Sequence, residues 1–232
     1  MRRSLKFQIL FAVVILLPGM QGLAKTNITG TNLRVNELVE LVKQDPTLKF
    51  DIRYATKNNF LHKIIYKEAK AFLQKPIAEA LVRVQKKVKK DGYSLLIFDG
   101  YRPWSVTKLF WDEIDPSKRK FIADPKTGSI HNRGCAVDLS LFDLKTEKEV
   151  KMPSEYDTFN ESAYSSYSGG TKEEKEKRDY LISVMREEGF TVHPNEWWHF
   201  DHKDCDKYEI LDLSFDEITS EDLSVSNKAE RR

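Results

Sequence analysis

A compact apolar run, YSLLIFDG at residues 93–100, sets the first limit on the fold of this chain. Its length suits a buried strand, and the Asp-Gly pair at its end favours a turn. Helical spacing of apolar residues precedes the run from Pro76 to Asp91, and a second helix is expected from Pro103 to about Ile114. Arg102 is therefore expected just beyond the end of a strand.

The remaining segments add strands and helices in an irregular order. Alternation of apolar and polar residues predicts strands at 48–54 and 134–142, and an aromatic strand is expected at 197–201. A charged helix is expected from about 172 to 188, after a polar, glycine-bearing loop at 160–171. This mixture favours an α+β fold, a single domain with a central, mainly antiparallel sheet flanked by helices.

The first 24 residues differ from the rest of the chain. A basic end with three cations leads into an apolar run at 7–18 and then into small residues that end at Ala24. This is the pattern of a signal peptide, and the apolar run is shorter than the ~20 residues of a spanning helix. We expect cleavage near Ala24, an exported domain at 25–218 without stable membrane insertion, and a polar tail at 219–232.

Charge and cysteine content limit the possible partners. Loss of the three cations of the signal peptide changes the formal charge from +2 to −1 (2 − 3 = −1), so no nucleic-acid-binding surface is expected. The basic run Lys86–Lys90 is expected to be the solvated face of a helix. Cys135 and Cys205 are expected to be two buried thiols, and a disulfide between them is the alternative after export. The sequence gives no indication of the oligomeric state.

His131 and Asp138 are the first pair that could bind a metal ion together. Seven residues separate them, which is more than ~20 Å in a strand at ~3.3 Å per residue and about 10 Å in a helix at ~1.5 Å per residue. Neither geometry lets both side chains reach one ion. A turn at 132–134 could bring them together, because Gly134 permits a tight reversal of the chain.

Glu196 and His199 raise the same question, because a spacing of three places them on opposite faces of a straight strand. A turn at Pro194-Asn195 would let both face one cavity. Two histidines and one aspartate leave the fourth position of a zinc ion for water, which is the composition of a hydrolytic site. On these residues alone, structural histidines remain an alternative, and His202 competes with His199 as the ligand.

Several motifs together resemble one family, the zinc D-alanyl-D-alanine dipeptidases related to the enzyme of vancomycin resistance. The Ser-x-His-x-x-Gly-x-Ala-x-Asp signature and the Glu-x-x-His signature of that family match SIHNRGCAVD (129–138) and EWWHF (196–200). Three further segments are similar to the family and follow its order: DIRYATKNNF (51–60), FDGYRP (98–103) and MPSEYDTF (152–159). The resemblance covers about residues 35 to 218.

The resemblance implies one zinc ion per chain, held by His131, Asp138 and His199. It implies that Glu196 is the general base that activates the bound water. Arg102 would stabilise the oxyanion that forms when this water attacks the peptide carbonyl. His62, His193 and His202 are then predicted to be structural.

Two further residues are implied to contact the substrate. Asp157 matches the family aspartate that receives the free ammonium group, and Ser129 matches a substrate-contacting serine. The expected protein is an exported zinc dipeptidase, periplasmic or secreted, that hydrolyses D-alanyl-D-alanine in cell-wall peptide turnover. The alternatives are a zinc D,D- or L,D-carboxypeptidase or endopeptidase that acts on peptidoglycan stem peptides, and a non-catalytic zinc module that binds cell-wall peptides. An intact Glu196 argues against the non-catalytic module.

Overall fold

The structure, a computed structural model, describes residues 33–219. The predicted signal peptide at 1–24 lies outside the described residues, and so does the predicted tail except for its first residue. The strands are β1 Leu38–Glu40, β2 Lys49–Phe50, β3 Phe72–Gln74, β4 Tyr93–Asp99, β5 Ala136–Asp143, β6 Lys148–Glu149, β7 Phe190–His193 and β8 Glu196–His202. The labelled α-helices are α1 Leu41–Gln44, α2 Lys75–Lys90, α3 Trp104–Glu113 and α4 Lys172–Glu187, and residues 215–219 are also helical.

A six-stranded sheet forms the centre of the described region. Its strand order is β2-β4-β5-β8-β7, and β6 pairs with β5 outside this path. Only the pairing of β2 with β4 is parallel, and the other pairings within the sheet are antiparallel. β1 and β3 form a separate antiparallel pair. The expected α+β fold with a mainly antiparallel sheet is therefore confirmed.

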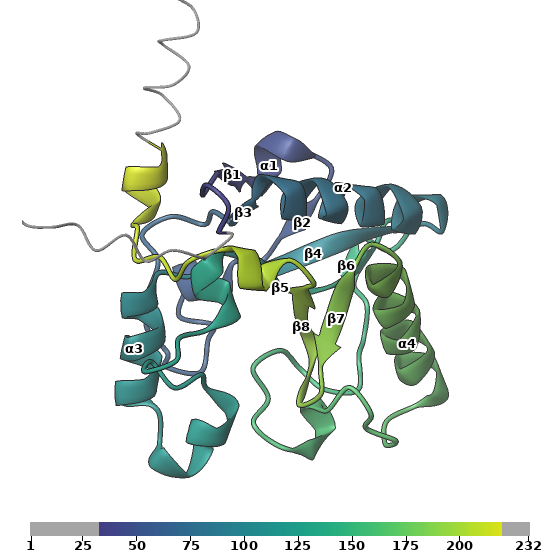
Figure 1. The fold of residues 1–232 in the computed structure, drawn as a ribbon. Helices are drawn as coiled ribbons and strands as arrows, with labels where there is room; N and C mark the ends of the chain where they lie inside the picture. Colours follow the sequence, from purple (N-terminus) through teal and green to yellow (C-terminus); the bar gives the residue numbers. More distant parts are fainter. Residues whose placement is uncertain (1–32, 220–232) are drawn as a thin grey trace, which may run out of the picture. The chain divides into compact units, whose positions relative to one another are not determined.

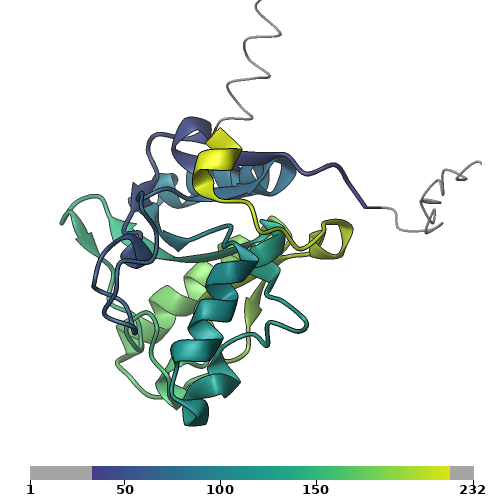
Figure 2. The same cartoon turned by 90° about the vertical axis from the view of Figure 1, so that its left-hand side faces the viewer.

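Helices α2 and α4 pack against this sheet and against each other. Pro76 lies in the first turn of α2, and apolar residues at helical spacing make one side of this helix fully buried. A capping box between Thr171 and Glu174 begins α4, which contacts β7 and β8. In Figure 1, β7 and β8 lie between α3 and α4, and Figure 2 shows α3 toward the viewer. No helix within 33–219 is long and apolar enough to cross a membrane.

The strand expected at 48–54 is shorter than predicted. Only Lys49 and Phe50 pair with β4, and the chain then turns into a 3-10 helix at Arg53–Ala55. The ring of Tyr54 is buried against Phe110, with 4.8 Å between the ring centroids. Packing of this aromatic ring therefore replaces the strand that the alternating pattern predicts.

The expectation of two buried thiols is wrong, because Cys135 and Cys205 form a disulfide. Cys135 directly precedes β5, and its carbonyl oxygen accepts a hydrogen bond from the backbone nitrogen of His202 at the end of β8. This pairing places the two cysteines with 5.5 Å between their Cα atoms, within the usual range for a disulfide. Because their sequence separation is 70, the sequence does not show this proximity.

Candidate metal centre

Strand register brings three polar residues into one row across the sheet. Asp99 at the end of β4 pairs with Asp138 on β5, and Asp138 pairs with His199 on β8. Residues that lie directly opposite each other on neighbouring strands point to the same face. Asp138 and His199 therefore lie side by side on the same face although they are 61 positions apart in the sequence.

His131 reaches the same place from a turn before β5. The turn expected at 132–134 is the end of a 3-10 helix at Ile130–Arg133, and Gly134 follows it with a φ of 69°. This left-handed backbone conformation favours glycine and reverses the chain before β5 begins. Ser129 caps the 3-10 helix, because its hydroxyl oxygen accepts a hydrogen bond from the backbone nitrogen of His131.

The three candidate ligand atoms form a small triangle. His199 Nδ1 lies 3.0 Å from His131 Nε2 and 3.0 Å from Asp138 Oδ1. The third side, from His131 Nε2 to Asp138 Oδ1, is 3.3 Å. Ligands at zinc bond lengths of ~2.0–2.2 Å in tetrahedral geometry lie about 3.3 Å from one another. The triangle therefore has the size that a tetrahedral zinc ion requires.

Each of the two histidine rings is also held by a contact of the ring nitrogen that points away from the triangle. Their outer ring nitrogens lie 2.7 Å from the carbonyl oxygen of Gly100 (His131 Nδ1) and 2.9 Å from Asp201 Oδ1 (His199 Nε2). When the rings are neutral, each outer nitrogen donates its hydrogen to that oxygen, which leaves a lone pair on the nitrogen inside the triangle. Two nitrogen lone pairs and a carboxylate oxygen then converge, so the triangle is suited to a cation.

The pKa shifts of two residues in the triangle also indicate a site that is suited to a cation. Burial raises the pKa of the Asp138 carboxyl, but His131 and His199 outweigh it and lower this pKa far below its usual range. Burial lowers the pKa of His199, but the hydrogen bonds that its ring donates to the Asp138 and Asp201 carboxylates outweigh it and raise this pKa well above its usual range. Both shifts mean that the site favours a positive charge between the donors.

Glu196 lies beside the triangle without belonging to it. The hairpin turn at Pro194-Asn195 precedes it, and the pairing of β7 with β8 shifts register there, so Glu196 does not follow the simple alternation of β8. Its Oε2 lies 3.8 Å from His199 Nδ1. Burial raises the pKa of Glu196 to about 7, and Asp138 adds to the rise while His199 opposes it. A carboxyl with this pKa is suited to general base catalysis near neutral pH.

Arg102 follows β4 and lies on the other side of Asp138. Its Nε and one terminal nitrogen contact Asp99 Oδ2 at 2.9 Å and 2.8 Å, and the terminal nitrogen lies 3.6 Å from Asp138 Oδ2. Asp99 therefore fixes the direction of the guanidinium group. A guanidinium group has five N–H donors, so donors remain beyond those that face Asp99.

Asp157 combines a strained backbone with a partly unsatisfied carboxylate. Its φ of 59° is in the left-handed region, which is uncommon for a residue other than glycine. Oδ1 accepts a hydrogen bond of 3.2 Å from Tyr54, whereas Oδ2 is buried without a hydrogen-bond partner among the described residues. This oxygen can receive a donor from a ligand.

All seven predicted site residues line one cavity of about 250 Å³. This volume lies below the ~300–1,000 Å³ of pockets for drug-sized ligands, so the cavity suits a small ligand. The lining residues named in the sequence prediction are Arg102, Ser129, His131, Asp138, Asp157, Glu196 and His199. Ser129 is buried, and its hydroxyl oxygen is already used as the cap of the 3-10 helix.

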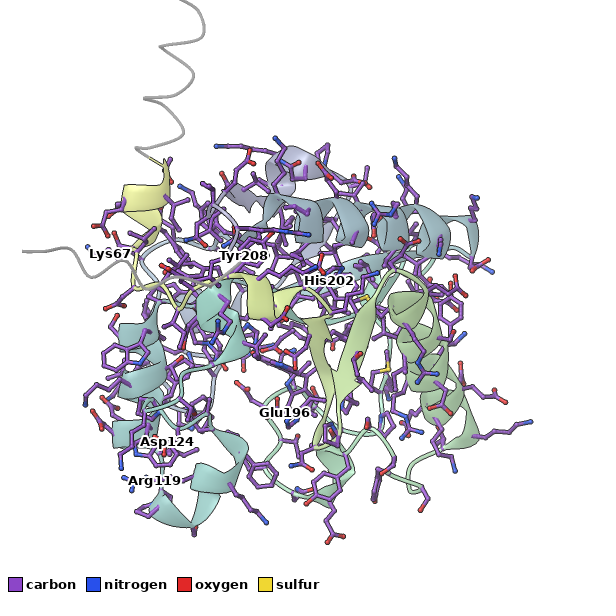
Figure 3. All side chains as sticks on the ribbon, viewed as in Figure 1. Lys67, Arg119, Asp124, Glu196, His202 and Tyr208 are labelled. Atoms are coloured by element: carbon purple, nitrogen blue, oxygen red, sulfur yellow. A yellow bond between two sulfur atoms is a disulfide. The ribbon has the colours of Figure 1, made fainter. Side chains whose placement is uncertain are left out.

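Two of the histidines that were predicted to be structural, His193 and His202, differ in their distance from the cavity. His202 lies at the opposite end of β8 from Glu196 (Figure 3), and its ring packs on Phe190. His193 lines the cavity, with its ring centroid 5.5 Å from that of His199. Burial and the nearby His199 lower the pKa of His193, so a neutral ring is favoured at this position.

Three residues of the site were given no role in the sequence analysis. Asp201 holds His199, and the hydroxyl of Tyr156 lies 3.0 Å from Asp138 Oδ2. Tyr54 contacts Asp157. Asp201 could have been found, because it lies two residues after His199 and so on the same face of the strand. The two tyrosines lie in the segments 51–60 and 152–159 that resemble the family, but only the tertiary fold shows which groups they contact.

Comparisons with known proteins show to which family the chain is similar. A sequence model of the D-ala-D-ala dipeptidase family (Peptidase M15) matches residues 34–218. A D-alanyl-D-alanine dipeptidase of Escherichia coli (strain K12) is 30% identical over 176 residues, which cover 75% of this chain and 89% of that protein. A D-alanyl-D-alanine dipeptidase of Enterococcus faecium is 30% identical over 171 residues, which cover 66% of this chain and 85% of that protein.

Among solved structures, the LdcB LD-carboxypeptidase matches with a TM-score of 0.43 and 19% identity, covering 76% of this chain and 73% of that chain. The match of the family model extends over nearly the whole described region, and the relatives above match over most of their own length. On this sequence similarity, the chain belongs to the D-Ala-D-Ala dipeptidase family of M15 peptidases and is a hydrolase.

Proposed function

We propose that this protein is an exported zinc dipeptidase that hydrolyses D-alanyl-D-alanine. The observation that carries the proposal is the triangle of His131, Asp138 and His199 donors, with the Glu196 carboxyl 3.8 Å from His199 Nδ1. The names of the similar proteins support the choice of substrate, because the relatives are D-alanyl-D-alanine dipeptidases.

His131 Nε2, Asp138 Oδ1 and His199 Nδ1 would hold one zinc ion per chain. Zinc at such a site supplies a Lewis acid, which lowers the pKa of water and polarises a peptide carbonyl. The donor set supports this choice of metal, because two imidazole nitrogens and one carboxylate oxygen leave one tetrahedral position open. Gly100 and Asp201 keep the two rings in place.

Glu196 would move the proton during hydrolysis. Its carboxylate accepts a proton from the attacking water and later donates it to the amine that leaves when the peptide bond breaks. The pKa of about 7 suits both steps. Burial makes the carboxylate basic enough to accept a proton from water, and a pKa near neutral still lets the carboxyl group return that proton to the amine.

Arg102 would stabilise the charge that develops on the carbonyl oxygen. Its hydrogen bonds to Asp99 hold the guanidinium group in the buried cavity before the substrate binds. A donor that is already fixed in a buried site stabilises a developing oxyanion without further reorganisation.

Asp157 would select substrates with a free amino end. Its buried Oδ2 would accept a hydrogen bond from the substrate's ammonium group. Asp157 lines the same cavity of about 250 Å³ as the proposed metal ligands, and this volume can hold a dipeptide. A carboxylate that binds a free ammonium group favours a dipeptidase over an enzyme that trims stem peptides.

The predicted signal peptide and the disulfide support a location outside the cytoplasm, periplasmic or secreted. There the partner would be a small dipeptide, and the role would be peptide turnover during cell-wall degradation.

A panel of peptides tests the proposal. The mature protein, residues 25–232, is incubated with zinc and with free D-Ala-D-Ala, its L,L and L,D counterparts, an N-acetylated D-Ala-D-Ala and a peptidoglycan stem pentapeptide. Products are followed by mass spectrometry. Release of D-alanine from free D-Ala-D-Ala, with at least ~100-fold slower cleavage of the N-acetylated form, is expected because acetylation removes the charge that Asp157 would bind. Faster cleavage of the stem peptide would overturn the proposal in favour of a carboxypeptidase or endopeptidase.

A further inference from the structure

We propose that Tyr156 and Tyr54 are positioning residues that link the metal site to the site for the substrate's amino end. Tyr156 orients the proposed ligand Asp138, and Tyr54 orients the proposed ammonium receptor Asp157. This inference rests on the proposed function for the role of Asp157, but its metal-binding half can be tested without any substrate.

A continuous series of contacts carries the proposal. The Tyr156 hydroxyl lies 3.0 Å from Asp138 Oδ2 and 3.2 Å from the Tyr54 hydroxyl. The Tyr54 hydroxyl lies 3.2 Å from Asp157 Oδ1. Asp138 uses its other oxygen, Oδ1, toward the two histidines. Both carboxylates are therefore held by a tyrosine on one oxygen and present the other oxygen to a ligand.

Aromatic packing fixes the two hydroxyl groups. The Tyr156 ring stacks on Phe98 with 4.6 Å between centroids and meets the Trp198 ring edge-on at 5.4 Å. The Tyr54 ring packs against Phe110, and the two tyrosines are only 2% (Tyr54) and 5% (Tyr156) exposed. Side chains packed in this way cannot move their hydroxyl groups without displacing neighbouring rings.

A count of hydrogens assigns a separate task to each tyrosine. The series has three oxygen–oxygen contacts, but each tyrosine supplies only one hydrogen. When both carboxylates are ionised, each attracts the hydrogen of its own tyrosine, because a charged acceptor makes the stronger hydrogen bond. Tyr156 then donates to Asp138 and Tyr54 donates to Asp157, and the contact between the two hydroxyl oxygens carries no hydrogen.

The two tyrosine-to-phenylalanine variants should therefore have different effects. Tyr156→Phe removes the donor behind Asp138 and is expected to weaken zinc binding by about 10-fold or more, as changes to groups that orient metal ligands do. Tyr54→Phe removes the donor to Asp157 and is expected to raise KM for D-Ala-D-Ala by about 10-fold, since a hydrogen bond to a charged group is lost. Zinc affinity should change less than about twofold in Tyr54→Phe, and KM should change less than about twofold in zinc-saturated Tyr156→Phe.

Tyr101→Phe is the matched control. Tyr101 is fully buried, and its hydroxyl bonds to the backbone oxygen and nitrogen of Leu213 at 3.0 Å and 2.8 Å, outside the series. This variant loses buried hydrogen bonds as the other two do, so it reports the effect of general destabilisation. Its zinc affinity and KM are expected to match those of the wild-type protein.

The measurements are the zinc dissociation constant of the metal-free protein, from competition with a chromophoric chelator, and KM and kcat of each zinc-saturated variant. Weaker zinc binding in Tyr156→Phe with an unchanged KM, and a higher KM in Tyr54→Phe with unchanged zinc binding, support the proposal. Wild-type zinc affinity in Tyr156→Phe, or an equal loss in Tyr101→Phe, would overturn it, and so would an unchanged KM in Tyr54→Phe. Failure of the wild-type protein to cleave D-Ala-D-Ala would instead overturn the proposed function, and the zinc affinities would still test the role of Tyr156.

Discussion

Asp157 shows how a single residue can be costly to the fold and useful to the site. Burial raises the pKa of its carboxyl well above the usual range, and Asp138 and Glu196 add to this rise. Arg102 and the hydrogen bond from Tyr54 oppose it. An ionised Asp157 is therefore disfavoured in the folded protein, although we propose that this form binds the substrate's ammonium group.

Asp157→Asn should separate these two effects. Because the pKa of this carboxyl is raised in the folded state, the wild-type protein loses stability as pH rises from about 4, the unfolded pKa, through the folded pKa. The variant lacks this loss and is expected to have a higher free energy of unfolding at pH 8, with no gain at pH 4. Its kcat/KM for D-Ala-D-Ala should fall by about 10–100-fold. Urea unfolding at both pH values and steady-state kinetics measure these effects.

The control for this variant is Asp206→Asn, which changes an exposed aspartate. It should leave kcat/KM for D-Ala-D-Ala unchanged, because Asp206 does not line the cavity. An Asp157→Asn protein that is less stable than the wild type at pH 8 would show that the ionised carboxylate is satisfied in the fold.

At the residue level, the sequence placed the candidate ligands correctly in one cavity but missed the groups that hold them. His131, Asp138 and His199 carry a family signature, and the turn at Gly134 explains how they can meet. The hydroxyl groups of Tyr54 and Tyr156 meet across 102 residues, a contact that only the folded chain creates. Neither local spacing nor residue type reveals such a pair.

At the level of elements, the ends of β5 and β8 are joined both by hydrogen bonds and by the Cys135–Cys205 disulfide. The disulfide closes a loop with a sequence separation of 70 residues, which restricts the unfolded chain. Reduction is expected to lower the free energy of unfolding by about 2–4 kcal/mol. Urea unfolding with and without a reductant measures this difference.

A Cys135→Ala/Cys205→Ala double variant provides the control for reduction. It should have the stability of the reduced wild-type protein and should not respond to the reductant. If the wild-type protein is equally stable with and without reductant, and alkylation shows that the reductant has acted, the predicted contribution of the disulfide is wrong.

Long, strongly patterned elements were the ones that the sequence could predict. α2, α4 and β4 begin and end within a residue or two of the expected positions, because apolar spacing, Pro76 and the Asp99-Gly100 turn mark them. β1, β3 and β6 have two or three residues each and were not predicted. Such short strands are defined by the partner strand with which they pair, and their own sequence carries little periodicity.

At the scale of the whole molecule, we expect that the first 24 residues are removed on export. Full-length protein expressed in a bacterium should be found outside the cytoplasm with a mass that corresponds to a start near residue 25. A variant with Leu10→Arg and Val14→Arg interrupts the apolar run and should remain uncleaved in the cytoplasm. Cell fractionation and intact-mass spectrometry measure both outcomes, and an intact N-terminus in exported wild-type protein would contradict the prediction.

Zinc titration of the metal-free mature protein tests whether hydrolysis depends on one bound zinc ion per chain. D-alanine release from D-Ala-D-Ala should rise in proportion to added zinc and stop rising at one zinc ion per chain. Glu196→Gln should bind the same amount of zinc but turn over about 10²–10⁴-fold more slowly, because it cannot accept the proton of the attacking water. Full turnover in the presence of a strong chelator, or wild-type turnover in zinc-loaded Glu196→Gln, would contradict the account.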